Sequence, residues 1–157
     1  MRKVWLLLSL GLALTWVGAL VGARHALPLQ GPLHAQGVRT PRVEVVPREA
    51  DRRVDVTVDG KPFTSYIWPT TLKKPTLYPL RAASGVTVTR GWPLEPRPGE
   101  RVDHPHQVGL WFNHGDVGGL DFWNNSDAIP AARADKMGTI VHRAVRHVQS
   151  GQGEGTL

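Results

Sequence analysis

The feature that most constrains the fold is a short run of strict alternation, VDVTV, at residues 54–58. Apolar and polar residues that alternate with a period of two are typical of a half-buried β-strand. Asp59 and Gly60 follow directly, and this dipeptide is a strong signal for a tight hairpin turn. Residues 63–68 are therefore predicted to return as the antiparallel partner strand.

Several other short segments have the composition of strands: they are residues 43–46, 77–81, 86–90, 108–112 and 138–149. The last of these also fits a helical stripe, but its β-branched residues and flanking glycines favour a strand with a bulge. A single helical turn is expected at residues 131–134. Short strands separated by many turns predict an all-β fold, an antiparallel sandwich or barrel, and we expect the sandwich.

The N-terminus is typical of an exported protein. Arg2 and Lys3 precede an uncharged apolar run at residues 4–23, which ends in the small residue Ala23. This pattern predicts that residues 1–23 are a signal peptide, but the run is also long enough to be an uncleaved signal anchor. The rest of the chain is therefore expected to be periplasmic or secreted, with a membrane anchor as the alternative.

Two further segments complete the predicted domain organisation. Residues 24–42 are rich in Pro, Gly and Gln and lack periodicity, which predicts a flexible tether. Residues 43–157 are predicted to be the N-terminal part of a β-sandwich domain. Thr156 and Leu157 resemble the start of a strand, so we expect the sandwich to be incomplete at the C-terminus and insoluble or molten when expressed alone.

Composition and charge exclude several classes of function. The chain has no cysteine, which excludes disulfides and thiolate metal ligands. Its formal net charge is +6, but the basic residues are scattered singly, so no nucleic-acid partner is expected. We find no P-loop, GxGxxG motif or Ser/His/Asp order.

Ionisable and aromatic residues crowd together at residues 100–125, which hold three of the seven histidines. A residue before proline is biased towards extended geometry, so His104 and His106 are expected to face one pocket from either side of Pro105. His114 and Asp116 have the same spacing and can turn back towards that pocket.

These four residues, His104, His106, His114 and Asp116, are the candidate catalytic residues. The three histidines are also candidate ligands for a divalent transition metal such as zinc, iron or copper, although the cofactor itself is not identified. A metal-free polar or acid–base site is the second interpretation. The third is that these side chains only cap turns.

Three further residues are candidate ligand-binding groups. In a strand at residues 108–112, Trp111 points to the face opposite Phe112, so Trp111 is expected to wall the pocket. Phe112 and Phe122 are expected in the core. Asp103 and Asp121 are the nearest acceptors for the second nitrogens of the histidines, although Asp121 also fits a turn.

The segment DHPHQVGLWFNHGDVGGLDFW, at residues 103–123, resembles bacterial secreted proteins labelled PmoA-like or "methane oxygenase". The upstream YPLRAASGVTVTRGWP and the downstream GTIVHR fit the same pattern, so the resemblance covers residues 53–157. Two polar groups of the pattern are missing, because Gln107 and Val108 replace a His-Arg pair. Gly118 replaces an asparagine. The resemblance implies an N-terminal half of an all-β sandwich similar to the supersandwich of mutarotases.

Three functions follow as hypotheses. The first is an exported sugar-modifying enzyme or enzyme fragment, and the second is a non-catalytic carbohydrate-binding module. The third is a metal-dependent oxygenase, which the label implies, although that label derives from a multi-span copper protein and this chain has one apolar segment. The expected partner is carbohydrate, and any membrane contact is expected only through an uncleaved N-terminal segment.

Overall fold

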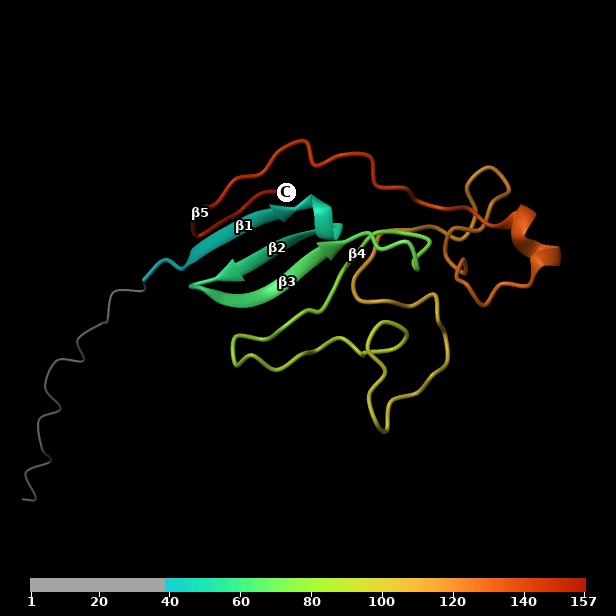
Figure 1. Ribbon diagram of the computed structural model, residues 1–157, viewed down its shortest axis with the longest axis horizontal. Helices are drawn as coiled ribbons and strands as arrows, with labels where there is room; N and C mark the ends of the chain where they lie inside the picture. Colours follow the sequence, from blue (N-terminus) through green and yellow to red (C-terminus); the bar gives the residue numbers. More distant parts are fainter. Residues whose placement is uncertain (1–38) are drawn as a thin grey trace, which may run out of the picture. The chain divides into compact units, whose positions relative to one another are not determined.

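The computed structural model describes residues 39–157. Their elements are β1 (Arg42–Arg48), the 3-10 helix η1 (Glu49–Asp51), β2 (Arg53–Val58), β3 (Lys61–Ile67), β4 (Thr76–Leu77), the 3-10 helix η2 (Ala131–Lys136) and β5 (Gly151–Gln152). The strands form one antiparallel open sheet in the order β4-β3-β2-β1-β5 (Figure 1). The described chain is thus mostly β, and it shows one sheet and not the two of a sandwich. The predicted signal segment and most of the predicted tether lie outside the described residues.

The β2–β3 hairpin is confirmed. Its turn residues, Asp59 and Gly60, both have positive φ, 51° and 75°, as the hairpin turn with the matching twist requires. Val54 is completely buried, at the centre of the small core. A register shift follows Val56, close to Pro62, which has no N–H to donate to a ladder.

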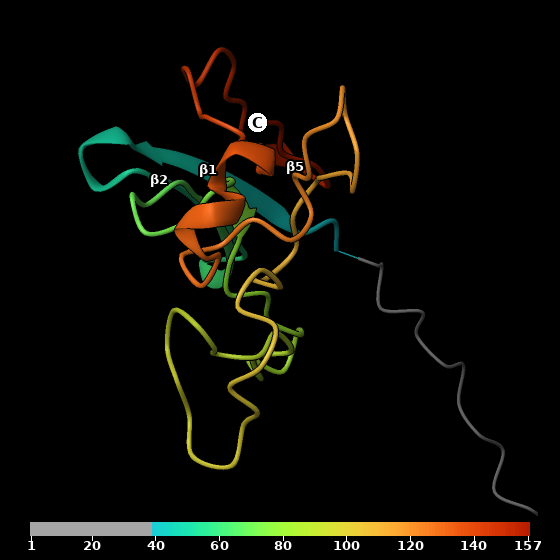
Figure 2. The same cartoon turned by 90° about the vertical axis from the view of Figure 1, so that its right-hand side faces the viewer.

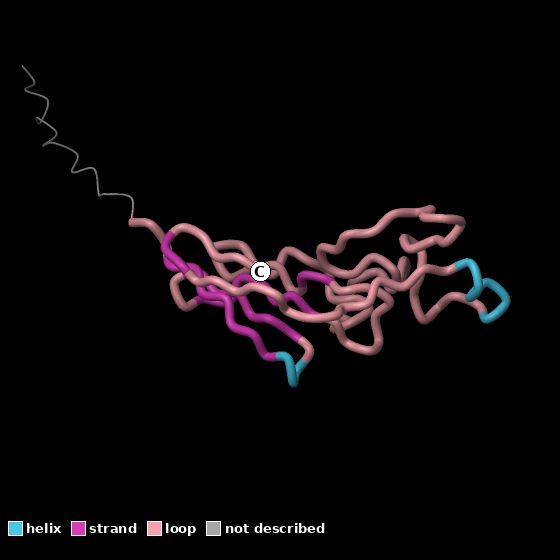
Figure 3. Tube along the Cα trace, turned by 90° about the horizontal axis from the view of Figure 1, so that it is seen from above, coloured by secondary structure: helices cyan, strands magenta, loops and turns pink. Residues whose placement is uncertain are grey.

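Most of the remaining chain is built from loops. Figure 3 shows the strands gathered in one part of the trace and loops in the rest, and Figure 2 shows the loops of residues 80–105 leaving the sheet. The predicted helical turn at residues 131–134 is confirmed as η2. At the chain's end, Thr156 forms an isolated bridge with Gln149 beside β5.

Three predicted strands beyond the hairpin are wrong. The strand expected at residues 77–81 is limited to β4, because Pro79 cannot donate a ladder hydrogen bond. Residues 86–90 make only a local bridge from Thr87 to Arg81. Residues 138–149 run without regular pairing, and Ile140 N–H donates to the Lys73 carbonyl at 2.9 Å.

The predicted strand at residues 108–112 is also wrong, and so is the core position of Phe112. Gly109 has φ 58°, which interrupts the extended run, and only Leu110 forms a bridge, to Leu77. The alternation argument therefore fails, and Phe112 is 87% exposed. Phe122 is half-buried, with its ring against Gly138.

Candidate functional site

A cavity of about 390 Å³ lies among the loops that follow β3. Its lining includes Lys73, Lys74, Trp92, His106, Trp111 and Asp127. Its volume is in the range of small-molecule sites, which combine apolar walls with a few polar groups. The cavity is therefore the candidate site, and it contains two of the predicted site residues, His106 and Trp111.

His104, Pro105 and His106 form a turn, which corrects the predicted extended geometry. His104 has φ 49°, and the Gln107 N–H donates to the His104 carbonyl at 2.9 Å. Proline is favoured at the second position of such a turn, and this preference outweighs the bias on the residue before it. The two imidazoles still come together, with ring centroids 5.7 Å apart and an edge-to-face arrangement.

Asp103 and Arg90 hold His104 in place. Asp103 Oδ2 lies 3.0 Å from His104 Nδ1, and its Oδ1 accepts from Arg90 Nη1 at 3.1 Å. Arg90 Nη2 also donates to the carbonyls of Asp103 at 2.6 Å and His104 at 2.7 Å. Desolvation alone would raise the pKa of Asp103, but the hydrogen bonds from His104 and Arg90 outweigh it and lower that pKa. Whenever His104 carries a single proton, the carboxylate holds that proton on Nδ1 and leaves Nε2 as an acceptor.

His106 presents a free imidazole to the cavity. Its ring nitrogens make no hydrogen bond to any residue between 39 and 157. Desolvation lowers the pKa of His106, the positive charges of Lys74, His104 and Arg90 lower it further, and Asp121 opposes them. Because the ordinary pKa is about 6.5, His106 is neutral at pH 7 and can accept a proton from a ligand.

Lys74 is a site residue that the sequence reasoning missed. It is only 6% exposed, and its Nζ donates to the carbonyls of Trp123 at 2.7 Å and Phe122 at 3.0 Å. The third acceptor is the amide oxygen of Asn113 at 3.2 Å, in the amide orientation that its neighbours require. Burial lowers the pKa of Lys74 to about 8, against an opposing effect of Asp121. No local pattern separates Lys74 from its neighbour Lys73, since its two carbonyl acceptors lie 48 and 49 residues away.

Trp111 is fixed on two sides. Its Nε1 donates to the same Asn113 amide oxygen, and Lys74 Nζ lies 5.7 Å from its ring centroid. The ring of Trp123 is tilted against it, at a centroid distance of 5.9 Å. Trp111 is thus a rigid wall of the cavity, while its role in ligand binding stays a prediction.

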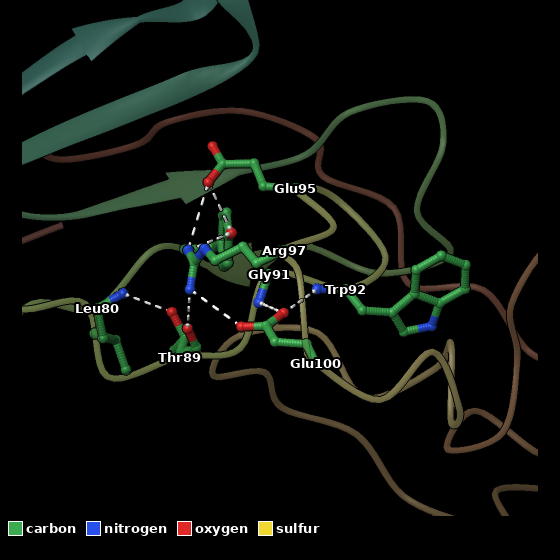
Figure 4. A network of polar contacts seen from close by, with 8 residues as sticks. Leu80, Thr89, Gly91, Trp92, Glu95, Arg97 and Glu100 are labelled. Carbon is green, nitrogen blue, oxygen red and sulfur yellow. Dashed lines mark hydrogen bonds and ion pairs between the residues drawn. The ribbon is translucent and has the colours of Figure 1, made fainter.

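Trp92 is the second aromatic wall, and the sequence reasoning missed it as well. Glu100 Oε2 accepts from the backbone N–H groups of Gly91 at 2.7 Å and Trp92 at 3.3 Å. Figure 4 shows the indole of Trp92 directed away from the Glu100 carboxylate. The indole Nε1 is buried and has no partner among the described residues.

A polar network stabilises the loop that carries Trp92 (Figure 4). Arg97 Nη1 donates to Glu100 Oε1 at 3.3 Å, and Tyr78 donates to Glu95 Oε2 at 3.0 Å. Arg97 Nη2 also lies 3.6 Å from that Glu95 oxygen. Burial and the neighbouring Glu95 raise the pKa of Tyr78 to about 12, so its hydroxyl remains a donor. The network anchors the loop without contacting the cavity.

His114, Asp116 and Asp121 do not line the cavity. His114 Nδ1 accepts from the Asp116 N–H at 3.1 Å, and Asp116 Oδ1 accepts from the Gly119 N–H at 2.8 Å. Asp121 accepts from the backbone N–H and side-chain amide of Asn124 at 2.9 and 2.7 Å, and these bonds lower its pKa. All three side chains therefore hydrogen-bond to local turns, and their predicted functional roles remain predictions.

The predicted metal ligands do not come together as a set of three in the described residues. In the part of the chain that the structure describes, no three His, Asp or Glu side chains are placed to hold one metal ion. The set contributes one close pair, His104 and His106. Three-histidine ligation stays a prediction.

Comparison with known proteins places the chain in a family. Residues 53–157 match the family of unknown function DUF6807. The chain belongs to this family. No curated protein and no solved structure matches it. The match begins at β2 and includes every residue of the cavity, so the site belongs to the family's own domain.

The DUF6807 site combines three chemical capabilities. Trp92 and Trp111 offer aromatic faces, His106 offers a free nitrogen, and Lys74 supplies a buried positive charge. Such a site can stack an apolar ring face, hydrogen-bond polar substituents and accept a proton.

Proposed function

We propose that this DUF6807 protein is an exported carbohydrate-related protein that binds a sugar in the cavity beside His106. The observation that carries the proposal is the pair of indoles, Trp92 and Trp111, which line the cavity together with that free imidazole. Sugar rings combine a flat C–H face with polar edges. Aromatic side chains stack on the C–H face, and groups such as His106 hydrogen-bond to the polar edges.

A sugar-modifying enzyme is the first form of the proposal, because a pair of groups suited to proton transfer is present. His106 is a neutral proton acceptor, and His104, oriented by Asp103, lies beside it. General acid–base chemistry requires a group within reach of each proton that moves. In this form one of the two histidines accepts a proton from a sugar hydroxyl, and the other serves as the neighbouring acid. A non-catalytic carbohydrate-binding module is the alternative.

The narrower assignments are also proposals. PmoA-like identity rests on the motif of residues 103–123, and the sandwich fold rests on that resemblance and on the open sheet. A metal-dependent oxygenase has the weakest support, since only two of the three proposed ligands lie together. Export rests on the pattern of residues 1–23. Within residues 39–157, no helix is long and apolar enough to cross a membrane.

Calorimetric titration with a panel of neutral and acidic monosaccharides tests sugar binding. We expect saturable binding that Trp111→Ala and His106→Ala each weaken by at least tenfold. Phe112→Ala is the matched control, because Phe112 is exposed and does not line the cavity. The proposal fails if no sugar binds, or if both cavity variants bind as the wild type does. Turnover of a bound sugar then separates the enzyme from the binding module.

A further inference from the structure

Lys74 is a buried cation without a paired anion. All three acceptors around its Nζ are neutral: two backbone carbonyls and the Asn113 amide oxygen. Among residues 39–157, no carboxylate lies within ion-pair distance of it. Neutral acceptors satisfy its hydrogen bonds but supply no negative charge in contact with it, which is costly in a buried position.

The other charges at the cavity do not offset Lys74. Asp127 is already paired with Lys73, at 2.5 Å. Asp121 acts on Lys74 and His106, but its oxygens bind Asn124 and it does not line the cavity. Asp103 is occupied by Arg90 and His104. The interior of the cavity is therefore positive.

We propose that the sugar bound in this cavity carries an anionic group, which pairs with His106 and offsets the charge of Lys74. The inference rests on the proposed function and narrows its substrate class to sugars with a carboxylate or a phosphate. His106 makes the direct contact because its ring nitrogens are free, whereas the protons of Lys74 are already used. An imidazolium donating to an anion makes a charge-assisted hydrogen bond, so binding takes up a proton on His106.

The groups around His106 explain why an anion is needed for that protonation. Lys74, His104 and Arg90 lower its pKa, and only Asp121 opposes them. A neutral sugar adds no charge and therefore leaves the pKa of His106 lowered. An anionic sugar adds a negative charge next to the ring and therefore raises that pKa.

A set of matched ligands tests the inference by calorimetry at pH 7 and low salt. The ligands are methyl glucuronide, its neutral methyl ester, glucose and glucose 6-phosphate. We expect the glucuronide to bind at least tenfold more tightly than its ester, with proton uptake seen as a dependence on buffer ionisation enthalpy. The glucuronide and its ester test a carboxylate, and glucose 6-phosphate and glucose test a phosphate. Tighter binding of the anionic member in either pair supports the inference.

Variants assign the effect to Lys74 and His106. In Lys74→Met the preference for the anion should fall to about one, and in His106→Gln the proton uptake should disappear. Lys61→Met is the matched control, since it removes the same charge from β3, away from the cavity, and should keep the preference. Because the ligand pairs are compared within the wild type, the test does not depend on whether a variant folds.

The possible failures are distinguishable. Equal affinity for the glucuronide, its ester and the phosphate overturns the inference and leaves the proposed sugar site standing. If none of the four ligands binds, the proposed function fails and the inference fails with it.

Discussion

The β1–β3 sheet and the loop-built cavity are stabilised in different ways. The sheet depends on backbone pairing, with a continuous antiparallel register from β1 to β2 and a register with one shift, after Val56, from β2 to β3. The cavity depends on single side chains that bind distant backbone groups. The main anchors are Lys74, Thr76, Arg90, Glu100 and Asn125. Many repeated backbone hydrogen bonds therefore stabilise the sheet, whereas a few individual side-chain hydrogen bonds stabilise the loops around the cavity.

This difference has a consequence for mutations. A side chain on the sheet surface can change without removing any backbone hydrogen bond. Loss of an anchor in the cavity region leaves buried carbonyl or N–H groups without partners, at a cost of about 1–3 kcal/mol for each. Substitutions in the two regions should therefore differ in their effects on stability.

Gly109→Ala should destabilise the protein most, by about 3 kcal/mol or more. Gly109 has φ 58°, and an added Cβ would meet the Leu77 carbonyl oxygen and lie 2.8 Å from Thr76 Oγ1. Left-handed strain and overpacking against backbone therefore add together. Urea denaturation measures the change. Gly115→Ala is the control, because nothing lies within 4 Å of its added Cβ, and the idea fails if both variants lose the same stability.

The same contrast explains what the sequence could predict. The hairpin follows from local information, since the alternation of residues 54–58 and the Asp59-Gly60 turn together span only residues 54–60. Lys74 could not be found in this way, because its acceptors, Phe122 and Trp123, are 48 and 49 residues away. Distant contacts of this kind leave no periodicity in the sequence.

The histidine turn shows a second limit. The rule for residues before proline predicted extended geometry at His104, but the chain turns there and the backbone of His104 adopts a left-handed conformation. Bonds from Arg90 to the carbonyls of Asp103 and His104 support that conformation. Two local rules competed at Pro105, and a contact 14 residues away favoured the turn. The two imidazoles lie close together, but only His106 lines the cavity, so that one pocket facing both histidines stays a prediction.

The pH dependence of stability should separate Lys74 from every residue of the sheet. Its pKa is about 8 in the folded protein, against an ordinary value of about 10.4. Between these values the unfolded chain binds more protons, so the contribution of Lys74 to stability rises with pH and is largest above about pH 10.4. At about 1.4 kcal/mol for each pKa unit, the rise is at most about 3 kcal/mol.

Denaturation of wild type and Lys74→Met at pH 7 and pH 10 measures this rise as a difference between the two proteins. The raised pKa of Tyr78 acts in both proteins and cancels. Lys61→Met, which removes the same charge from the sheet, is the matched control. A parallel pH dependence of wild type and Lys74→Met would contradict a lowered pKa at Lys74.

Glu100→Ala should have a smaller effect, about 2 kcal/mol, and a local one. The substitution leaves the N–H groups of Gly91 and Trp92 without their acceptor and removes the partner of Arg97. Hydrogen exchange should accelerate at residues 89–100 and stay unchanged in β2 and β3. Glu154→Ala is the control, because Glu154 is exposed and has no side-chain hydrogen bond within the described part of the chain. Uniform acceleration across the sheet would show that the two regions unfold as one unit.

Gly60→Ala should have the smallest effect, about 1 kcal/mol. Gly60 has φ 75°, but nothing lies within 4 Å of an added Cβ, so the cost is left-handed strain alone. Gly60→Asn should cost less, because asparagine tolerates this conformation better than alanine does. Gly109→Ala carries a comparable strain and, in addition, a collision with its neighbours. The difference in unfolding free energy between the two alanine variants, measured by urea denaturation, therefore gives the effect of the tight packing around Gly109. Equal losses at the two positions would show that the loops around the cavity yield as easily as the exposed turn of the hairpin.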